Sequence, residues 1–167
     1  WHSGTPRGPS SSRRRIVLTV LMLTLAALAG GSLLQVEFQG ELQGEFQGGL
    51  QGEAVRWAQA WTGKDSHALA GFMAGEGIRL HLPGEEHLSI RPRQAEAALR
   101  VFLRSYEAGE ASITRVSPIG GGAREGFAEI RWVTGSPGSR EPVIFTLFVG
   151  YALGDEGWAV TEIRILD

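Results

Sequence analysis

Three histidines are the side chains best suited to acid–base chemistry or metal binding in this sequence after residue 30: His67, His81 and His87. Imidazole titrates near neutral pH and is a common metal ligand, but these three lack a metal-binding spacing such as H-x-x-x-H. We therefore predict no metal site. His81 is the best candidate for a general base. However, it alternates with the apolar residues of a predicted strand, 78–82, so a solvent-facing or interface position is favoured over a catalytic one.

A carboxylate beside a cation is the second arrangement that could take part in catalysis. Glu129 and Arg131 lie two residues apart on one predicted strand, and so share a face. They form either an exposed cross-strand charge ladder or a buried catalytic pair. The three aspartates lie at a helix start, in a turn and at the C-terminus (Asp65, Asp155 and Asp167). None is in the middle of a strand, so the sequence predicts no matched acid–base pair.

Aromatic residues with polar tips are the remaining candidates for a binding site. Tyr106, Trp132 and Tyr151 could line a pocket that accepts a small apolar ligand, although core packing alone would also account for them. No glycine cluster precedes a helix in a strand–turn–helix context, so no phosphate loop is predicted. We expect no cofactor.

Composition sets limits on the class of protein. Hydrophobic residues make up 43% of the 167, enough for a packed core. The net charge is −2, but four arginines precede residue 30, which leaves 12 Lys and Arg against 18 Asp and Glu, or −6, in the rest. An acidic body argues against nucleic-acid binding, which needs a basic face. The absence of cysteine excludes disulfides and thiolate metal sites.

The N-terminal region, residues 1–29, has the features of an export signal. Three arginines (Arg13–Arg15) precede an apolar run, 16–29, that ends in the small residues Ala27-Leu28-Ala29. This order predicts a cleaved signal peptide. The alternatives are an uncleaved membrane anchor over residues 16–34 and a buried soluble helix. With either a signal or an anchor, we expect the rest of the chain to be exported, to the periplasm or beyond, or held outside the cytoplasm.

Residues 30–52 contain a four-residue repeat, EFQG-ELQG-EFQG-GLQG, from Glu37 to Gly52. A helix would place its apolar residues in one stripe but would include a glycine in each unit, at about 1 kcal/mol each. We interpret the repeat as a low-complexity tether. A short amphipathic helix and a recognition segment for a partner remain alternatives.

Residues 53–167 have the pattern of a folded α+β domain. Apolar spacing predicts a helix from Glu53 that stops at Gly63, a short helix capped by Asp65, and a helix from Pro92 to about Gly109. Alternation and turn residues predict strands at 78–82, 87–91, 111–119, 127–133, 143–153 and 158–166. A block of strands after the helices favours an antiparallel sheet.

This order resembles the nuclear transport factor 2-like (SnoaL-like) superfamily. The stretch "IRLHLPGEEHLSIRPRQAEAALRVFL" and the final "VTEIRIL" are similar to a small bacterial domain of unknown function within it. The departure is Phe102-Leu103, where that pattern favours two aromatics. The resemblance implies a cone, with a curved antiparallel sheet wrapped on a long helix and preceded by two short helices.

The superfamily contains both enzymes and binding modules, so the resemblance leaves the function open. Its enzymes use polar groups buried inside the cone, such as the aspartate base and oxyanion hole of the ketosteroid isomerases. Because no such set is apparent here, we expect a non-catalytic domain that binds a small ligand or a partner protein. The alternatives are an isomerase- or hydrolase-type enzyme that uses His81 or Glu129, and a structural module that forms homodimers through the outer face of its sheet.

Overall fold

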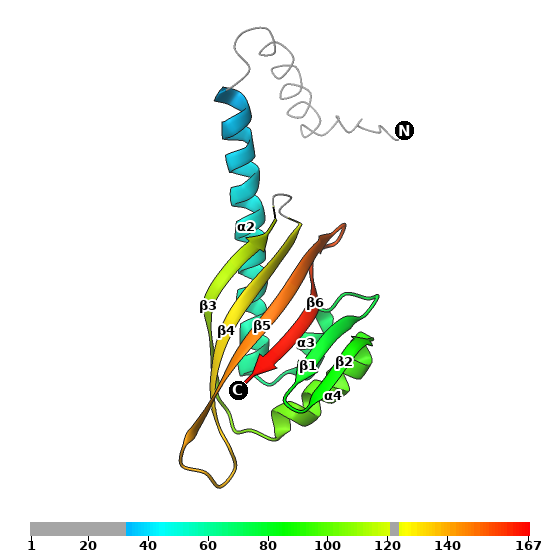
Figure 1. Cartoon of the computed structure of the whole chain (residues 1–167), viewed down its shortest axis with the longest axis vertical. Helices are drawn as coiled ribbons and strands as arrows, with labels where there is room; N and C mark the ends of the chain where they lie inside the picture. Colours follow the sequence, from blue (N-terminus) through cyan, green and yellow to red (C-terminus); the bar gives the residue numbers. More distant parts are fainter. Residues whose placement is uncertain (1–32, 121–123) are drawn as a thin grey trace, which may run out of the picture. The chain divides into compact units, whose positions relative to one another are not determined.

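The computed structural model describes residues 33–120 and 124–167. Its strands all lie in one compact unit, Gln43–Asp167. The predicted signal or anchor falls almost wholly outside the described residues, among which no helix is both long enough and apolar enough to span a membrane. The elements in chain order (Figure 1) are α2 Leu33–Thr62, α3 Ser66–Gly71, β1 Ile78–Leu82, β2 Glu85–Ile90, α4 Pro92–Arg104, β3 Glu110–Ile119, β4 Glu125–Gly135, β5 Pro142–Gly154 and β6 Gly157–Leu166.

The six strands form one curved sheet in the order β2-β1-β6-β5-β4-β3 (Figure 1). The predicted meander is present, because β3 to β6 pair with their chain neighbours in antiparallel fashion. The prediction of a wholly antiparallel sheet is wrong at one pair. β1 pairs with β6 in parallel, with Leu80 opposite Ile163. The last strand of the meander therefore lies beside the first strand of the sheet and runs in the same direction.

The helix lengths differ from the sequence prediction. The expected long helix, α4, has 13 residues and ends at Arg104, whereas α2 has 30 and begins at Leu33 instead of Glu53. Gly109, the predicted stop of α4, instead lies tightly against β4, where an added Cβ would be 2.4 Å from the carbonyl oxygen of Val133.

The repeat, Glu37–Gly52, therefore lies within α2, and the compact unit that holds the sheet includes residues on the N-terminal side of residue 53. Leu50, in the last repeat unit, is fully buried in the core. It lies over Gly126 of β4, where an added Cβ would be 2.4 Å from Leu50 Cδ2. Packing of this kind outweighs the low helix propensity of the glycines.

α3 and α4 begin where the sequence predicts. Asp65 caps α3, with its carboxylate accepting a hydrogen bond from the Ala68 amide at 2.9 Å, and Pro92 opens α4.

The core lies between the helices and the face of the sheet that they cover, here called the inner face. Alternate residues of β4 and β5 point into it, as their alternating burial requires. α2 contributes two fully buried tryptophans, and α4 contributes its apolar face. The buried residues of the inner face on β4, β5 and β6 include Ala128, Ile130, Trp132, Phe145, Leu147, Val149, Tyr151, Val160, Ile163 and Ile165.

Candidate functional site

Aromatic rings from α2, α4 and the sheet fill part of the inner side of the domain. Trp61 of α2 packs edge-to-face on Trp132 of β4 with ring centroids 5.4 Å apart, and Trp132 stacks on Phe145 of β5 at 5.4 Å. Tyr106 contacts Trp132 at 5.5 Å and Phe145 at 5.0 Å. Two of the three pocket candidates, Tyr106 and Trp132, thus pack against each other within the core.

The third candidate, Tyr151, is buried elsewhere on the inner face, with 2% of its surface exposed. Burial, and secondarily the negative charge of Glu53 on α2, raise the pKa of its hydroxyl above the ordinary tyrosine value. Glu53 is a residue that sequence reasoning did not single out. Its effect on the pKa of Tyr151 depends on how α2 packs on β5, which the sequence alone does not show.

Four buried polar atoms on this inner side have no hydrogen-bond partner among the described residues. A buried unpaired donor costs about 1–3 kcal/mol, so these atoms either reduce stability or meet a polar group that enters from outside. They are the indole Nε1 atoms of Trp57, Trp61 and Trp132 and the hydroxyl of Tyr151.

His81 lies on the opposite, outer face of the sheet, in an ion cluster. Its Nδ1 is 3.3 Å from Glu86 Oε1 and its Nε2 is 3.7 Å from Glu162 Oε1. Glu162 also forms ion pairs with Arg164, at 2.7 Å, and with Arg79, at 2.9 Å. Glu162 is therefore engaged by two arginines on the outer surface, and the His81 imidazole does not face the aromatic interior.

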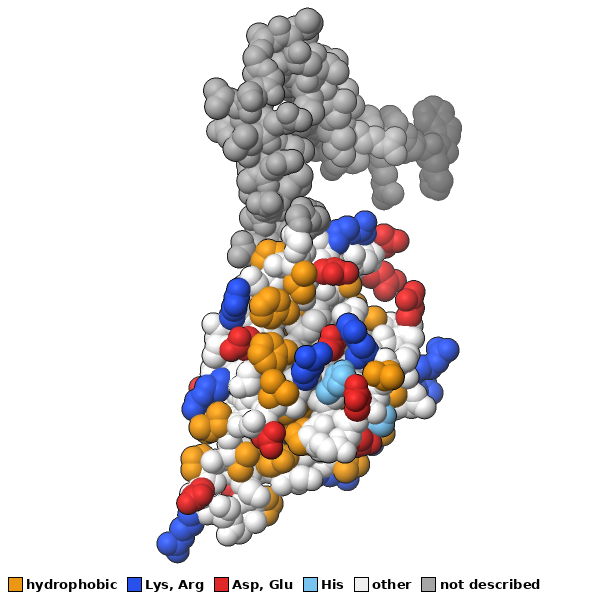
Figure 2. Space-filling view, viewed as in Figure 1, with side chains coloured by type: hydrophobic (Ala, Val, Ile, Leu, Met, Phe, Trp, Pro, Cys, Tyr) orange, Lys and Arg blue, Asp and Glu red, His pale blue; other side chains and the backbone are white. Residues whose placement is uncertain are grey.

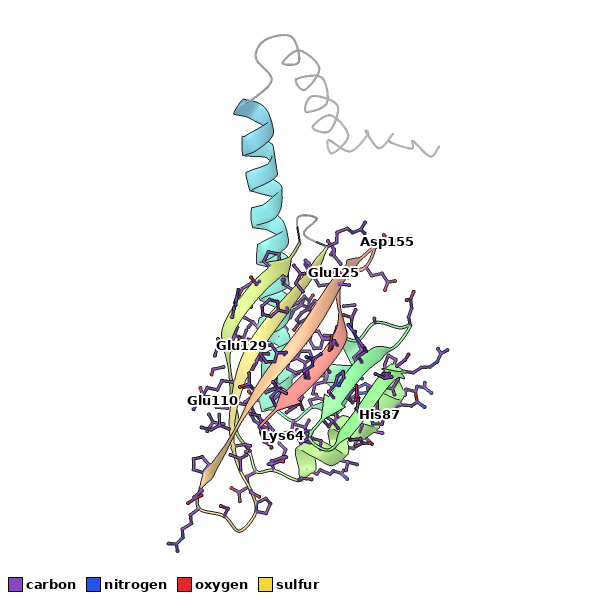
Figure 3. All side chains as sticks on the ribbon, viewed as in Figure 1. Lys64, His87, Glu110, Glu125, Glu129 and Asp155 are labelled. Carbon is purple, nitrogen blue, oxygen red and sulfur yellow. The ribbon has the colours of Figure 1, made fainter. Side chains whose placement is uncertain are left out.

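Glu129 lies on the same outer face, on β4 (Figure 3). Its carboxylate accepts a hydrogen bond from the Thr114 hydroxyl at 3.2 Å, and its register partner on β3 is Arg115. Arg131 is exposed on the same strand. This position has the geometry of a charge ladder between strands.

The outer face carries one row of residues that crosses all six strands. It is centred on Phe148 of β5 and has charged or titratable side chains on both sides. We call this the cross-strand row. In spatial order from β3 to β2 it consists of Arg115, Glu129, Phe148, Arg164, His81 and Glu86.

Apolar side chains accompany this row on the outer face. Ile144 and Leu166 are 46% and 45% exposed, and Phe127 and Phe148 are half-buried. Figure 2 shows this face, with apolar side chains gathered along the strands beside a group of histidine, arginine and acidic side chains. An apolar centre with polar groups around it is the arrangement that protein–protein interfaces use.

The other two histidines lie apart from these groups. His67, on α3, has a side chain 91% exposed and 3.6 Å from Glu96, and His87, on β2, is 2.8 Å from Glu85. Across the part of the chain that the structure describes, no cluster of three His, Asp or Glu could hold a metal ion.

Two open cavities lie away from the aromatic interior. One, of about 320 Å³, lies between the start of α3 and α4 and has Leu103, Arg100 and Arg104 among its lining residues. The other, of about 510 Å³, is a groove between α2 and the edge strand β3, with Val55 and Ile113 in its wall.

Comparison with known proteins identifies the fold. A Bacteroides ovatus protein of the DUF4783 family has a TM-score of 0.54 and 16% identity, over 66% of this chain and 90% of that one. A ketosteroid isomerase-like protein from Erwinia carotovora atroseptica has a TM-score of 0.59 and 11% identity, over 71% and 93%. A Catenulispora acidiphila protein with the ketosteroid isomerase-like fold, in complex with trimethylamine, has 0.54 and 18%, over 68% and 83%.

These likenesses establish the nuclear transport factor 2-like fold for this chain, in agreement with the sequence resemblance. No family model matches the sequence, and no curated protein matches it. At 11–18% identity the solved structures give the architecture and not the chemistry.

Proposed function

We propose that this nuclear transport factor 2-like domain is a non-catalytic interaction module that works through the outer face of its sheet, and that its first partner is a second copy of the same chain. The observation that carries the proposal is the cross-strand row with its apolar neighbours. The packed aromatic interior supports it as well, because the rings of Trp61, Trp132 and Phe145 occupy space where a cone-fold enzyme would hold substrate.

The order of charges in the row favours self-association. A two-fold axis parallel to the strands, above Phe148, would bring this residue against its own copy. It would also bring Glu129, on one side of Phe148, opposite Arg164 of the second copy, and the reverse contact would form by symmetry. Two identical ion pairs then flank an aromatic centre, and each face supplies the glutamate of one pair and the arginine of the other.

Charge reversal tests this arrangement in solution. Glu129→Arg would place like charges opposite Arg164 at both symmetric positions, so we expect the dimer dissociation constant to rise about 100-fold or more. Glu129→Arg combined with Arg164→Glu should restore much of the affinity. Arg93→Glu, on exposed α4, is the control and should leave the affinity unchanged. The measurement is sedimentation equilibrium. A wild-type chain that stays monomeric at tens of micromolar, or a single reversal without effect, would refute the proposal.

A small ligand on the inner side is the second candidate, and the unpartnered hydroxyl of Tyr151 favours it. The Tyr151 hydroxyl, which lies apart from the packed rings of Trp61, Trp132 and Phe145, could donate to a polar atom of a bound molecule. Native mass spectrometry of chain purified from its own host tests this. A retained non-covalent mass that Tyr151→Phe loses would support the ligand, and a clean protein mass would count against it.

We also propose that the domain is exported from the cytoplasm, because arginines followed by an apolar run in residues 13–29 are typical of an export signal. Fractionation of the producing cell with an antibody against the domain tests it. Domain found only in the cytosol would contradict export.

A further inference from the structure

The cavity between α3 and α4 carries more positive than negative side chains. It has a volume of about 320 Å³, and its floor contains Leu103, which is 1% exposed. The cationic lining residues stand out because the chain beyond residue 30 has a net charge of −6. The full lining is Lys64, Asp65, Ser66, His67, Arg100, Leu103 and Arg104.

Arg100 and Arg104 stand one turn apart on α4, on the two sides of Leu103. Like charges at this spacing disfavour a helix by about 0.2–0.5 kcal/mol. Arg100 is partly compensated, because it pairs with Glu96 and its Nε is 3.5 Å from the hydroxyl of buried Ser66. Within the described part of the chain, Arg104 has no ion pair or side-chain hydrogen bond. Its guanidinium is therefore available.

Lys64 faces the same cavity from the turn after α2 (Figure 3). Its φ of 53° is in the left-handed region, which non-glycine residues seldom adopt. Its Nζ donates a 2.6 Å hydrogen bond to the carbonyl oxygen of Tyr106. That bond fixes the position of the ammonium group and leaves two of its three N–H donors free.

The acidic groups nearby are already engaged. Asp65 accepts a hydrogen bond from the Ala68 amide, and Glu96 pairs with Arg100 and approaches His67 at 3.6 Å. Three permanent cations thus line the cavity with one carboxylate, Asp65, which is already hydrogen-bonded.

We propose that this cavity binds an oxyanion, a carboxylate or a phosphate group, between Arg104 and Lys64. The planar guanidinium of Arg104 can donate two hydrogen bonds to such a group, and the Lys64 ammonium supplies a fixed point charge. Arg100 adds positive potential from the next turn of α4. The site shares no residue with the outer sheet face, so it is independent of the proposed dimer.

The test is a titration of the full chain with inorganic phosphate and, separately, with acetate, replacing sodium chloride at constant ionic strength. Binding is followed by the backbone amide NMR shifts of Ser66, His67 and Leu103. We expect saturable shifts at these amides with one or both anions. Arg104→Gln should weaken binding about tenfold, as expected for one lost charge-assisted hydrogen bond. Arg104→Lys should recover part of the loss.

Arg93→Gln is the matched control, because it removes one exposed arginine from the same helix, outside the cavity lining. It should leave the dissociation constant unchanged. Saturation with phosphate alone or with acetate alone supports the site and assigns the class of anion. The absence of saturable shifts with both anions would overturn the proposal, and so would equal weakening by Arg93→Gln and Arg104→Gln.

Discussion

Leu50 gives the sharpest test of whether the four-residue repeat is part of the folded domain. It belongs to the last repeat unit, is fully buried, and packs over Gly126 of β4. Leu50→Ala removes its isobutyl group from the core while keeping a residue of high helix propensity. Any loss of stability therefore reports packing and not helix formation.

The expected loss follows from burial. Truncation of a fully buried leucine to alanine costs about 2–5 kcal/mol, from lost transfer free energy and the cavity left behind. Leu50 lies near the end of the sheet-bound part of α2, where neighbouring groups can partly collapse into the space, so we expect about 3 kcal/mol. For a unit of this size that corresponds to a fall in melting temperature of roughly 10 °C.

Gly52→Ala is the matched control two residues away in the same repeat unit. A Cβ added at Gly52 would have no atom within 4 Å, and alanine in a helix interior is favoured over glycine by about 0.5–1 kcal/mol. The two substitutions should therefore shift stability in opposite directions. The assay is urea unfolding at 25 °C followed by tryptophan fluorescence and circular dichroism.

The tether interpretation makes a different prediction, because neither residue of an unpacked tether would alter the free energy of unfolding. A Leu50→Ala loss below about 0.5 kcal/mol, the range of ordinary surface substitutions, would refute the packing argument. It would return the domain boundary to residue 53.

Two further substitutions test neighbouring parts of the core. Gly126→Ala should destabilise by about 1–3 kcal/mol because its Cβ would overlap Leu50; the cost should shrink in a Leu50→Ala background, and additivity in the double-mutant cycle would contradict direct contact. Tyr151→Phe should raise stability at neutral pH by about 1 kcal/mol, because it removes an unpartnered buried hydroxyl. Burial raises the pKa of Tyr151 in the folded protein, so as the pH rises this hydroxyl ionises in the unfolded chain before it does in the folded one. Wild-type stability is therefore intact below a pH of about 10 and falls above it. In urea unfolding at a series of pH values, Tyr151→Phe should lose less stability than the wild type over that alkaline range. An identical dependence of stability on pH for the two proteins would count against a raised pKa at Tyr151.

The strands could be predicted because burial on one face of a sheet leaves an alternating pattern. Ile78, Leu80 and Leu82 show it in β1, and the matching burial is seen in the structure. The starts of α3 and α4 could also be predicted, since Asp65 and Pro92 carry the chemistry of a cap and a first turn.

Features set by contacts distant in the sequence could not be predicted. The burial of Leu50 within the repeat involves its contact with Gly126, and no sequence pattern around Gly126 predicts this contact. The parallel pairing of Leu80 with Ile163 likewise leaves no local signal. The cross-strand row depends on the register of five strand pairs, so Glu129 and His81 could be named as residues but not placed in one line.

The cavity residues were missed for a similar reason. Lys64 reads as an ordinary residue after a helix stop, and Arg104 as part of the solvent-exposed face of α4. Only the folding of α3 onto α4 brings the two together.

The position of β6 has a consequence for how the chain comes to be folded. β6, which follows the other five strands in the sequence, lies inside the sheet, with β5 on one side and β1 on the other. Until residues 157–166 have emerged from the ribosome, the β1–β2 hairpin has no edge to join and Val149 and Leu80 lack the strand that separates them. The β1–β2 hairpin therefore cannot join the β3–β5 meander before β6 is available, since long-range pairing cannot precede its own partner strand. Removal of β6 would leave a three-stranded meander and a separate β1–β2 hairpin, so one strand holds the two parts of the sheet together.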